Sequence, residues 1–180
     1  MKGQEARLTN ASLQLFGGFV RTQGTLGLGT AAPPFNSTVS IQGLQLGPAL
    51  QAVGTDQVSM SGTASAELAV SGRGLTHPDL VKALAGTGRV AVREGKIEGI
   101  NLLQQASMLL KVVGVSLDNV KATAFSAIES DFAIKQGLIV VQRLLIDSHD
   151  FQATGGGTIG LDQSLDMKLN LNLSQALSQK

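Results

Sequence analysis

The segment from Asp147 to Asp150 is the only place where acidic residues and a histidine stand together. Carboxylates and imidazoles ligate metals and transfer protons. On a strand, Asp147 and His149 would share one face, but a metal site normally needs three or four ligands. Ser148, His149 and Asp150 cannot form a triad on one strand, because adjacent side chains point to opposite faces. We therefore predict a solvated turn between two strands, with no metal and no catalytic residues.

Two glycine-rich segments have the spacing of nucleotide-binding loops. Gly155, Gly157 and Gly160 fit G-x-G-x-x-G, and "GLGTAA" from Gly27 comes close. A dinucleotide site needs its last glycine to begin a helix, whose N-terminus binds the pyrophosphate. Here the first motif continues into "LDQSLDMKL" and the second into two prolines. We predict bulged or closely packed strand glycines and no cofactor.

The composition excludes several classes of function. The net charge is +1 with no run of Lys or Arg, and there is no Trp or Tyr, so neither phosphate neutralisation nor base stacking is supported. Sugar-binding platforms usually rely on Trp and Tyr, which disfavours a carbohydrate-binding domain. There are no cysteines and two histidines, of which His77 precedes Pro78 at a predicted helix start and is expected to be structural. We expect no nucleic-acid partner and no enzyme.

No segment is long and apolar enough to span a membrane. The N-terminus lacks an apolar signal region, and the longest apolar run, "LIVVQRLLI" from Leu138, is interrupted by Gln142 and Arg143. A span needs about 20 apolar residues. The sequence also begins within an alternating pattern. We expect residues 1–180 to form a single domain taken from a longer polypeptide.

Apolar residues alternate with polar ones along most of the chain, which predicts strands. The segment "FNSTVSIQ" places Phe35, Val39 and Ile41 on one face. Similar alternation runs through 58–70, 128–134 and 151–173, with turns at Gln136-Gly137 and near Asp162-Gln163. From Val58 to Val70 the shared face is predicted to hold Val58, Met60, Ala64, Ala66, Leu68 and Val70. Short turns between strands indicate an antiparallel sheet.

A Gly-Thr pair followed by small or apolar residues recurs at Gly24, Gly62, Gly86 and Gly157. Glycines inside strands commonly mark bulges, bends or close backbone approach. The repetition predicts a strongly curved sheet built from similar hairpins.

Three segments predict short helices that cover part of the sheet. "GPALQAVG" has a proline suited to a first helical turn and ends in Gly54. "THPDLVKALAG" predicts a helix capped by Thr76, with Asp79 three residues on and an end at Gly86. "NLLQQASMLLKVVG" predicts a third helix from Asn101 to Gly114. Its apolar face would consist of Leu102, Ala106, Leu109, Leu110 and Val113.

The order of these elements resembles the C-terminal region of the AsmA family of bacterial envelope proteins. The resemblance covers residues 36 to 173, and its most specific segments are "GTGRVAVREGKIEGINL" from Gly86 and "FSAIESDFAIKQGL" from Phe125. It implies a periplasmic module of a protein anchored in the inner membrane of a Gram-negative bacterium, with a role in outer-membrane biogenesis. Larger relatives resemble long β-grooves that carry phospholipid along an apolar interior. A chain of this length could bind an acyl chain but could not bridge an envelope.

The segment "LDMKLNLNL" is the clearest amphipathic strand, and its apolar side could serve either of two structures. In one, helices and facing strands cover it as an ordinary core. In the other, the sheet curls into a trough whose floor accepts lipid tails. We favour a mainly β fold, a curved antiparallel sheet or groove with two to three short covering helices, that binds or guides phospholipid without catalysis. The alternative function is a structural adaptor that recruits another envelope protein through an open sheet edge.

The predicted lipid-facing residues form a floor on the strands and a lid on the third helix. The floor consists of Phe132, Ile134, Ile159, Leu161, Leu165, Met167, Leu169, Leu171 and Leu173, and the lid of Leu109 and Leu110.

Overall fold

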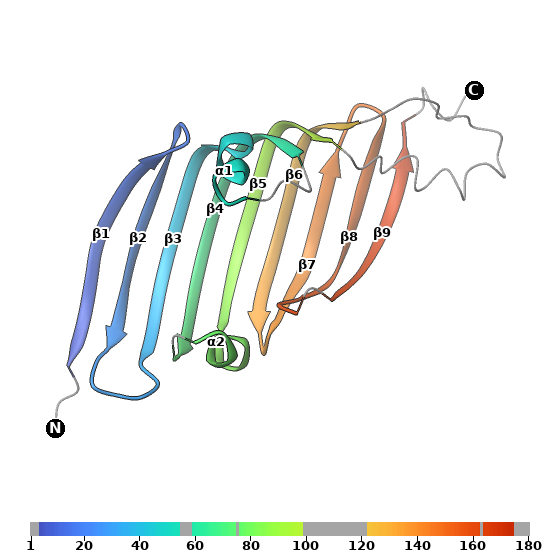
Figure 1. Cartoon of the computed structure of the whole chain (residues 1–180). Coiled ribbons are helices and arrows are strands. Elements are labelled where there is room, and N and C mark those ends of the chain that lie inside the picture. The colour runs from blue at the N-terminus through green and yellow to red at the C-terminus, as the bar shows by residue number, and fades with distance from the viewer. Residues whose placement is uncertain (1–3, 55–58, 75, 99–121, 163, 175–180) are drawn as a thin grey trace.

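A computed structural model of the chain describes residues 4–54, 59–74, 76–98, 122–162 and 164–174. These residues are mostly β and form one nine-stranded antiparallel sheet in the order β1 to β9, which does not close. Figure 1 shows the strands side by side in one layer, with β1 and β9 at opposite edges. The strands are β1 Glu5–Leu15, β2 Gly18–Gly27, β3 Pro34–Gln45, β4 Ser59–Arg73, β5 Ala85–Glu98, β6 Ala122–Lys135, β7 Leu138–Asp147, β8 Phe151–Gly160 and β9 Leu165–Leu173. The mainly β, curved antiparallel prediction is confirmed.

Two short helices are α1 (Leu46–Ala52) and α2 (His77–Ala83). Helix α1 contacts β4 and β3, and α2 contacts β4. Figure 1 places them at opposite ends of the strands. The predicted helix from Asn101 to Gly114 lies outside the described residues.

Thr76 caps α2 as the sequence predicts. Its hydroxyl donates to Asp79 Oδ2 at 2.7 Å and accepts from the Asp79 backbone N–H at 3.4 Å. The predicted end at Gly86 is wrong, since α2 ends at Ala83 and Gly86 belongs to β5. A Cβ at Gly86 would overlap the carbonyl oxygen of Ala69 on β4, so this glycine permits close strand pairing instead of ending a helix.

Both predicted turns are present. Gln136 and Gly137 have φ values of 52° and 78°, which is the type I′ geometry that matches the twist of a two-residue hairpin. At the β8–β9 turn, the Asp162 carboxylate accepts from the backbone N–H of Ser164 at 3.0 Å and from its hydroxyl at 2.7 Å. Local turn chemistry therefore explains the antiparallel pairing of β6 with β7 and of β8 with β9.

Strand register collects the apolar side chains on one side of the sheet, called here the apolar face; the opposite side is the polar face. One row of directly opposite residues crosses seven strands and contains only apolar residues: Leu44, Ala64, Val92, Ile128, Ile146, Ala153 and Leu171. Phe35, Val39 and Ile41 lie on the same face, as do Met60 and the other predicted residues of β4. Val58 lies outside the described residues.

The core lies on the apolar face of β4 to β8, toward the strand ends next to α1. Its buried cluster consists of Ala64, Val92, Phe125, Ile146, Phe151 and Ala153. Phe151 is only 2% exposed. Exposure rises toward both edges of the sheet, where Leu13 of β1 is 57% exposed and Leu165 of β9 is 69% exposed.

In two of the recurring Gly-Thr pairs, those at Gly62 and Gly157, the glycine lies where a side chain would not fit. Gly62 has φ 131° and lies between Ser61 and Thr63, where β4 faces the bulge in β5 at Glu94 and Gly95. A Cβ at Gly157 would overlap the carbonyl oxygen of Asp166 on β9. The predicted bulge and close approach are both present.

Candidate functional site

The predicted floor residues of β6, β8 and β9 lie together on the apolar face near the β9 edge. Ile134 pairs with Ile139, Ile139 with Ile159, and Ile159 with Leu165, so one apolar row runs to the edge. A second row contains Phe132, Val141, Gly157 and Met167. Leu169, Leu171 and Leu173 pair with Gly155, Ala153 and Phe151. The sheet thus assembles these side chains into one continuous surface.

Not every predicted floor residue belongs to this surface. Leu161 follows the last residue of β8 and lies in the β8–β9 turn, where its backbone N–H donates to the Gly137 carbonyl at 2.8 Å. The predicted lid residues, Leu109 and Leu110, lie outside the described residues. The described floor is therefore made of strand residues.

The apolar face also includes a first edge that the predicted floor omits. Leu8, Leu13 and Leu15 of β1 lie on it and are 49%, 57% and 39% exposed. The sequence signal was present but changes phase, because a bulge at Asn10, with φ 54°, shifts the alternation from even to odd positions. Reading the apolar positions on either side of a bulge as one strand would have found this edge.

Phenylalanine rings lie over glycines at three places on the apolar face. A Cβ at Gly72 would lie 2.7 Å from Cζ of Phe35, and a Cβ at Gly95 would overlap the ring of Phe125. In each case the two residues are directly opposite on neighbouring strands. The third pair is Phe132 and Gly88. Because the glycine has no side chain, the ring can lie flat against the neighbouring strand and cover its backbone.

The polar face carries a row of directly opposite residues across seven strands: Ser12, Arg21, Ser40, Glu67, Arg89, Asp131 and Arg143. Asp131 accepts from Arg89 Nε at 2.7 Å and contacts Arg143 Nε at 3.2 Å. Glu129 binds Arg93 and lies 3.3 Å from Arg143. Three arginines and two carboxylates therefore form one ion-pair network across β5, β6 and β7.

These contacts shift the ionisation of both partners. The hydrogen bond from Arg89 lowers the pKa of Asp131, with further lowering by the charges of Arg89 and Arg143. The same hydrogen bond raises the pKa of Arg89. Both groups are charged at neutral pH, and because they are solvent-exposed the network contributes modestly to stability.

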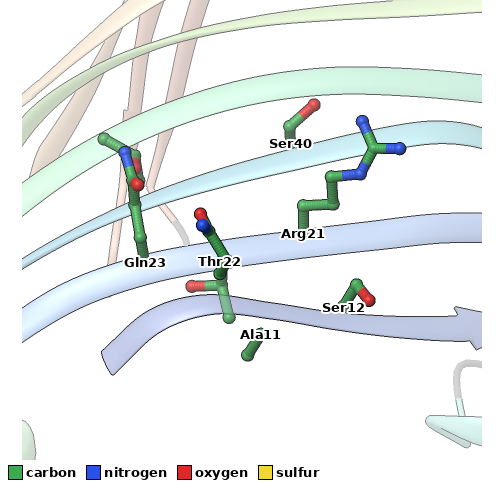
Figure 2. A pocket seen from close by; sticks show the side chains of 8 residues that line it. Ala11, Ser12, Arg21, Thr22, Gln23 and Ser40 are labelled. Carbon is green, nitrogen blue, oxygen red and sulfur yellow. The ribbon is translucent and has the colours of Figure 1, made fainter. Parts of the chain in front are cut away.

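A hollow of about 450 Å³ lies across β1, β2 and β3. Figure 2 shows Arg21 in it, with Ser12 and Ser40 on the neighbouring strands. Arg21 makes no ion pair within the described part of the chain. Two further hollows lie over β3 to β7 and include Glu67 and Arg89. All three hollows lie on the polar face, and Arg21, Glu67 and Arg89 give them charged side chains.

The acidic-histidine segment forms the predicted connection between two strands. Strand β7 ends at Asp147, and His149 and Asp150 are exposed. Ser126 Oγ donates to the Asp147 carbonyl at 3.0 Å, and Ser148 Oγ donates to the Ala124 carbonyl at 2.8 Å. In residues 4–54, 59–74, 76–98, 122–162 and 164–174, no three His, Cys, Asp or Glu side chains are grouped to hold a metal ion.

The glycine motif Gly155, Gly157 and Gly160 lies within β8. No helix begins at its last glycine, since a turn and β9 follow. The geometry that binds a pyrophosphate is therefore missing at this place, and the prediction of strand glycines is confirmed.

Comparisons with known proteins identify a family. The model of the AsmA family matches residues 1–144. The match includes strands that precede residue 36 and ends within β7. No match was found among curated proteins or solved structures. None of the helices in the described segments has the length and hydropathy to cross a membrane.

Proposed function

Because this chain belongs to the AsmA family, we propose that it is a non-catalytic module that binds or guides phospholipid acyl chains on the apolar face of its sheet. Membership of this family is consistent with a role in bacterial envelope or outer-membrane biogenesis. The proposal includes a periplasmic location and a parent protein anchored in the inner membrane.

The observation that carries the proposal is the exposure of leucines at both edges of one continuous apolar face. Leu8 and Leu13 are about half exposed at β1, and Leu165 and Leu169 are 69% and 49% exposed at β9. Removing apolar surface from water contributes about 25 cal/mol per Å². An acyl chain lying across these side chains would gain that contribution, and exposed apolar surface of this kind is typical of binding sites.

We assign the charged residues of the polar face a structural role, separate from lipid binding. Arg89, Arg143, Glu129 and Asp131 bind one another across strands. The Asp131 carboxylate is a poor proton acceptor, since the hydrogen bond from Arg89 lowers its pKa. We therefore assign these residues to structure, in keeping with a module that binds without catalysis.

The test compares two exposed leucines on opposite faces. Leu169 is 49% exposed on the apolar face, and Leu138 is 41% exposed on the polar face, where it pairs with Lys135. We expect Leu169→Asn to weaken binding of a fluorescent phospholipid about three- to tenfold, because it removes roughly 1 kcal/mol of apolar contact. Leu138→Asn should leave binding unchanged.

Native mass spectrometry of the protein from cells provides the second readout. Phospholipid should co-purify with the unmutated chain and less of it with Leu169→Asn. Absence of bound lipid from the unmutated protein by both methods would overturn the proposal. Equal loss of binding in the two variants would place the lipid elsewhere.

A structural adaptor is the second candidate function. It is favoured by the two edges of the sheet, β1 and β9, each of which pairs with only one strand among the described residues. An added strand from an envelope protein would bind through backbone hydrogen bonds, so it should resist substitution of Leu169. Retained partner binding by Leu169→Asn, together with absent lipid, would favour this function.

A further inference from the structure

Strand β9 directs half of its backbone hydrogen-bonding groups away from the sheet. The N–H of Ser174 donates to the Asp150 carbonyl at 2.9 Å, and the N–H of Gly160 donates to the Ser164 carbonyl at 2.7 Å. Hydrogen-bonded pairs alternate with non-hydrogen-bonded pairs in an antiparallel ladder. The even-numbered residues of β9 therefore bond to β8. The N–H and C=O groups that point outward belong to the apolar residues Leu165, Met167, Leu169, Leu171 and Leu173.

Of the features by which proteins commonly block strand addition, β9 has one lysine, Lys168, but no bulge, no proline and no inward-pointing charge. The β8–β9 register runs without a shift from Phe151–Leu173 to Ile159–Leu165. No proline lies in β9, and its two charged residues, Asp166 and Lys168, lie on the polar face. Strand β1, in contrast, is interrupted by the bulge at Asn10. The two edges of the sheet thus differ, and only β9 presents a regular ladder.

We propose that two copies of this chain pair antiparallel through β9, with Leu169 of each copy opposite Leu169 of the other on a two-fold axis normal to the sheet. In this register Leu165 lies opposite Leu173 and Met167 opposite Leu171. All of these residues direct their backbone groups outward, as a hydrogen-bonded pair requires. The axis keeps both apolar faces on the same side, so one apolar surface runs across both copies.

Charge disfavours one of the two neighbouring registers. With Leu169 on the axis, Asp166 lies opposite Asn172 and Lys168 opposite Asn170. Lysines of the two copies meet only diagonally, where long solvated side chains can diverge. Moving the axis to residue 168 would also satisfy the outward backbone groups, but it would place Lys168 directly opposite Lys168. Like charges directly opposite are destabilising.

The inference rests on the geometry of the edge and is independent of lipid binding. Pairing would place Leu165 and Leu169, which are the most exposed apolar residues of β9, beside apolar residues of the other copy and leave the apolar face open. A failure of the pairing experiment below would leave the lipid-binding experiment unaffected, and the reverse also holds.

Single cysteines test the register directly, because the sequence contains no cysteine. Across a hydrogen-bonded pair the Cα atoms lie about 5.5 Å apart, within the range that a disulfide spans. In the full chain under mild oxidation, Leu169→Cys should therefore form covalent dimers. Leu165→Cys is the matched control, since it is more exposed, yet the two copies of residue 165 would lie about 27 Å apart. We expect about tenfold more cross-linking at 169.

A second pair of variants tests the backbone. Leu171→Pro removes an outward N–H without removing a bond to β8, whereas Leu171→Ala keeps that N–H. By sedimentation analysis in the absence of lipid, the unmutated chain and Leu171→Ala should be dimers and Leu171→Pro a monomer, all with the same circular dichroism. A monomeric unmutated chain, a dimeric and folded Leu171→Pro, or cross-linking at 165 equal to that at 169 would overturn the proposal.

Discussion

The ring of Phe132 on β6 lies over Gly88 on β5, directly opposite on the apolar face. A Cβ at Gly88 would overlap the ring. Glycine in a strand costs stability through backbone entropy and the missing side chain. The aromatic ring of a cross-strand neighbour compensates by covering the exposed backbone. The Phe132 side chain therefore depends on the absence of a side chain at residue 88.

Replacement of Gly88 by alanine should destabilise the sheet, because the ring must leave its position. We expect a loss of about 1–3 kcal/mol in the free energy of unfolding, measured by denaturant titration. The double variant Gly88→Ala/Phe132→Leu should lose less than the sum of the single variants. Gly47→Ala is the control, since its Cβ would meet nothing closer than 3.9 Å and α1 favours alanine. Additive effects at residues 88 and 132 would show that ring and glycine are independent.

Polar substitutions at the centre and at the edge of the apolar face should differ in cost. Val141 is 8% exposed and Leu169 is 49% exposed on the same face. Val141→Asn would bury an amide without a partner, which should cost roughly 3 kcal/mol or more. Leu169→Asn leaves its amide in contact with water and should cost about 1 kcal/mol or less. Thermal melts of the two variants measure the difference, and equal losses would indicate that residue 169 is as enclosed as the core.

Acid should weaken the cross-strand network. The pKa of Asp131 is lowered by its hydrogen bond with Arg89, so its contribution is present above the ordinary carboxyl pKa of about 3.9 and is lost as the pH falls through the lower folded value. The melting temperature should therefore be steady from pH 7 to 5 and fall below about pH 4. The melting temperatures of the unmutated chain and Asp131→Asn should converge in that acidic range.

Asp162 provides a reference for this measurement. Its pKa is also lowered, by hydrogen bonds from the hydroxyl and N–H of Ser164, and it lies in the β8–β9 turn. Asp131→Asn should thus remove only part of the acid sensitivity. A variant whose melting temperature keeps the full pH dependence would show that the Arg89–Asp131 pair contributes nothing measurable.

Features decided within a few residues could be predicted from the sequence alone. Alternation of apolar and polar residues gave the strands, because side chains on an extended backbone point to alternate faces. The turn at Gln136-Gly137 and the Thr76 cap depend on local backbone geometry and hydroxyl chemistry, and both are present. The same alternation predicted which residues of β9 belong to the floor.

Features that depend on register across strands required the tertiary structure. Gly86 reads locally as a helix end, but its role is set by Ala69 on a neighbouring strand. The bulge at Asn10 changes which residues of β1 face the floor. Arg89, Asp131 and Arg143 are separated along the chain and meet only because β5, β6 and β7 pair in one register. Strand register is fixed by long-range contacts, which a local sequence pattern does not specify, so the tertiary structure alone decided which side chains share the exposed apolar face.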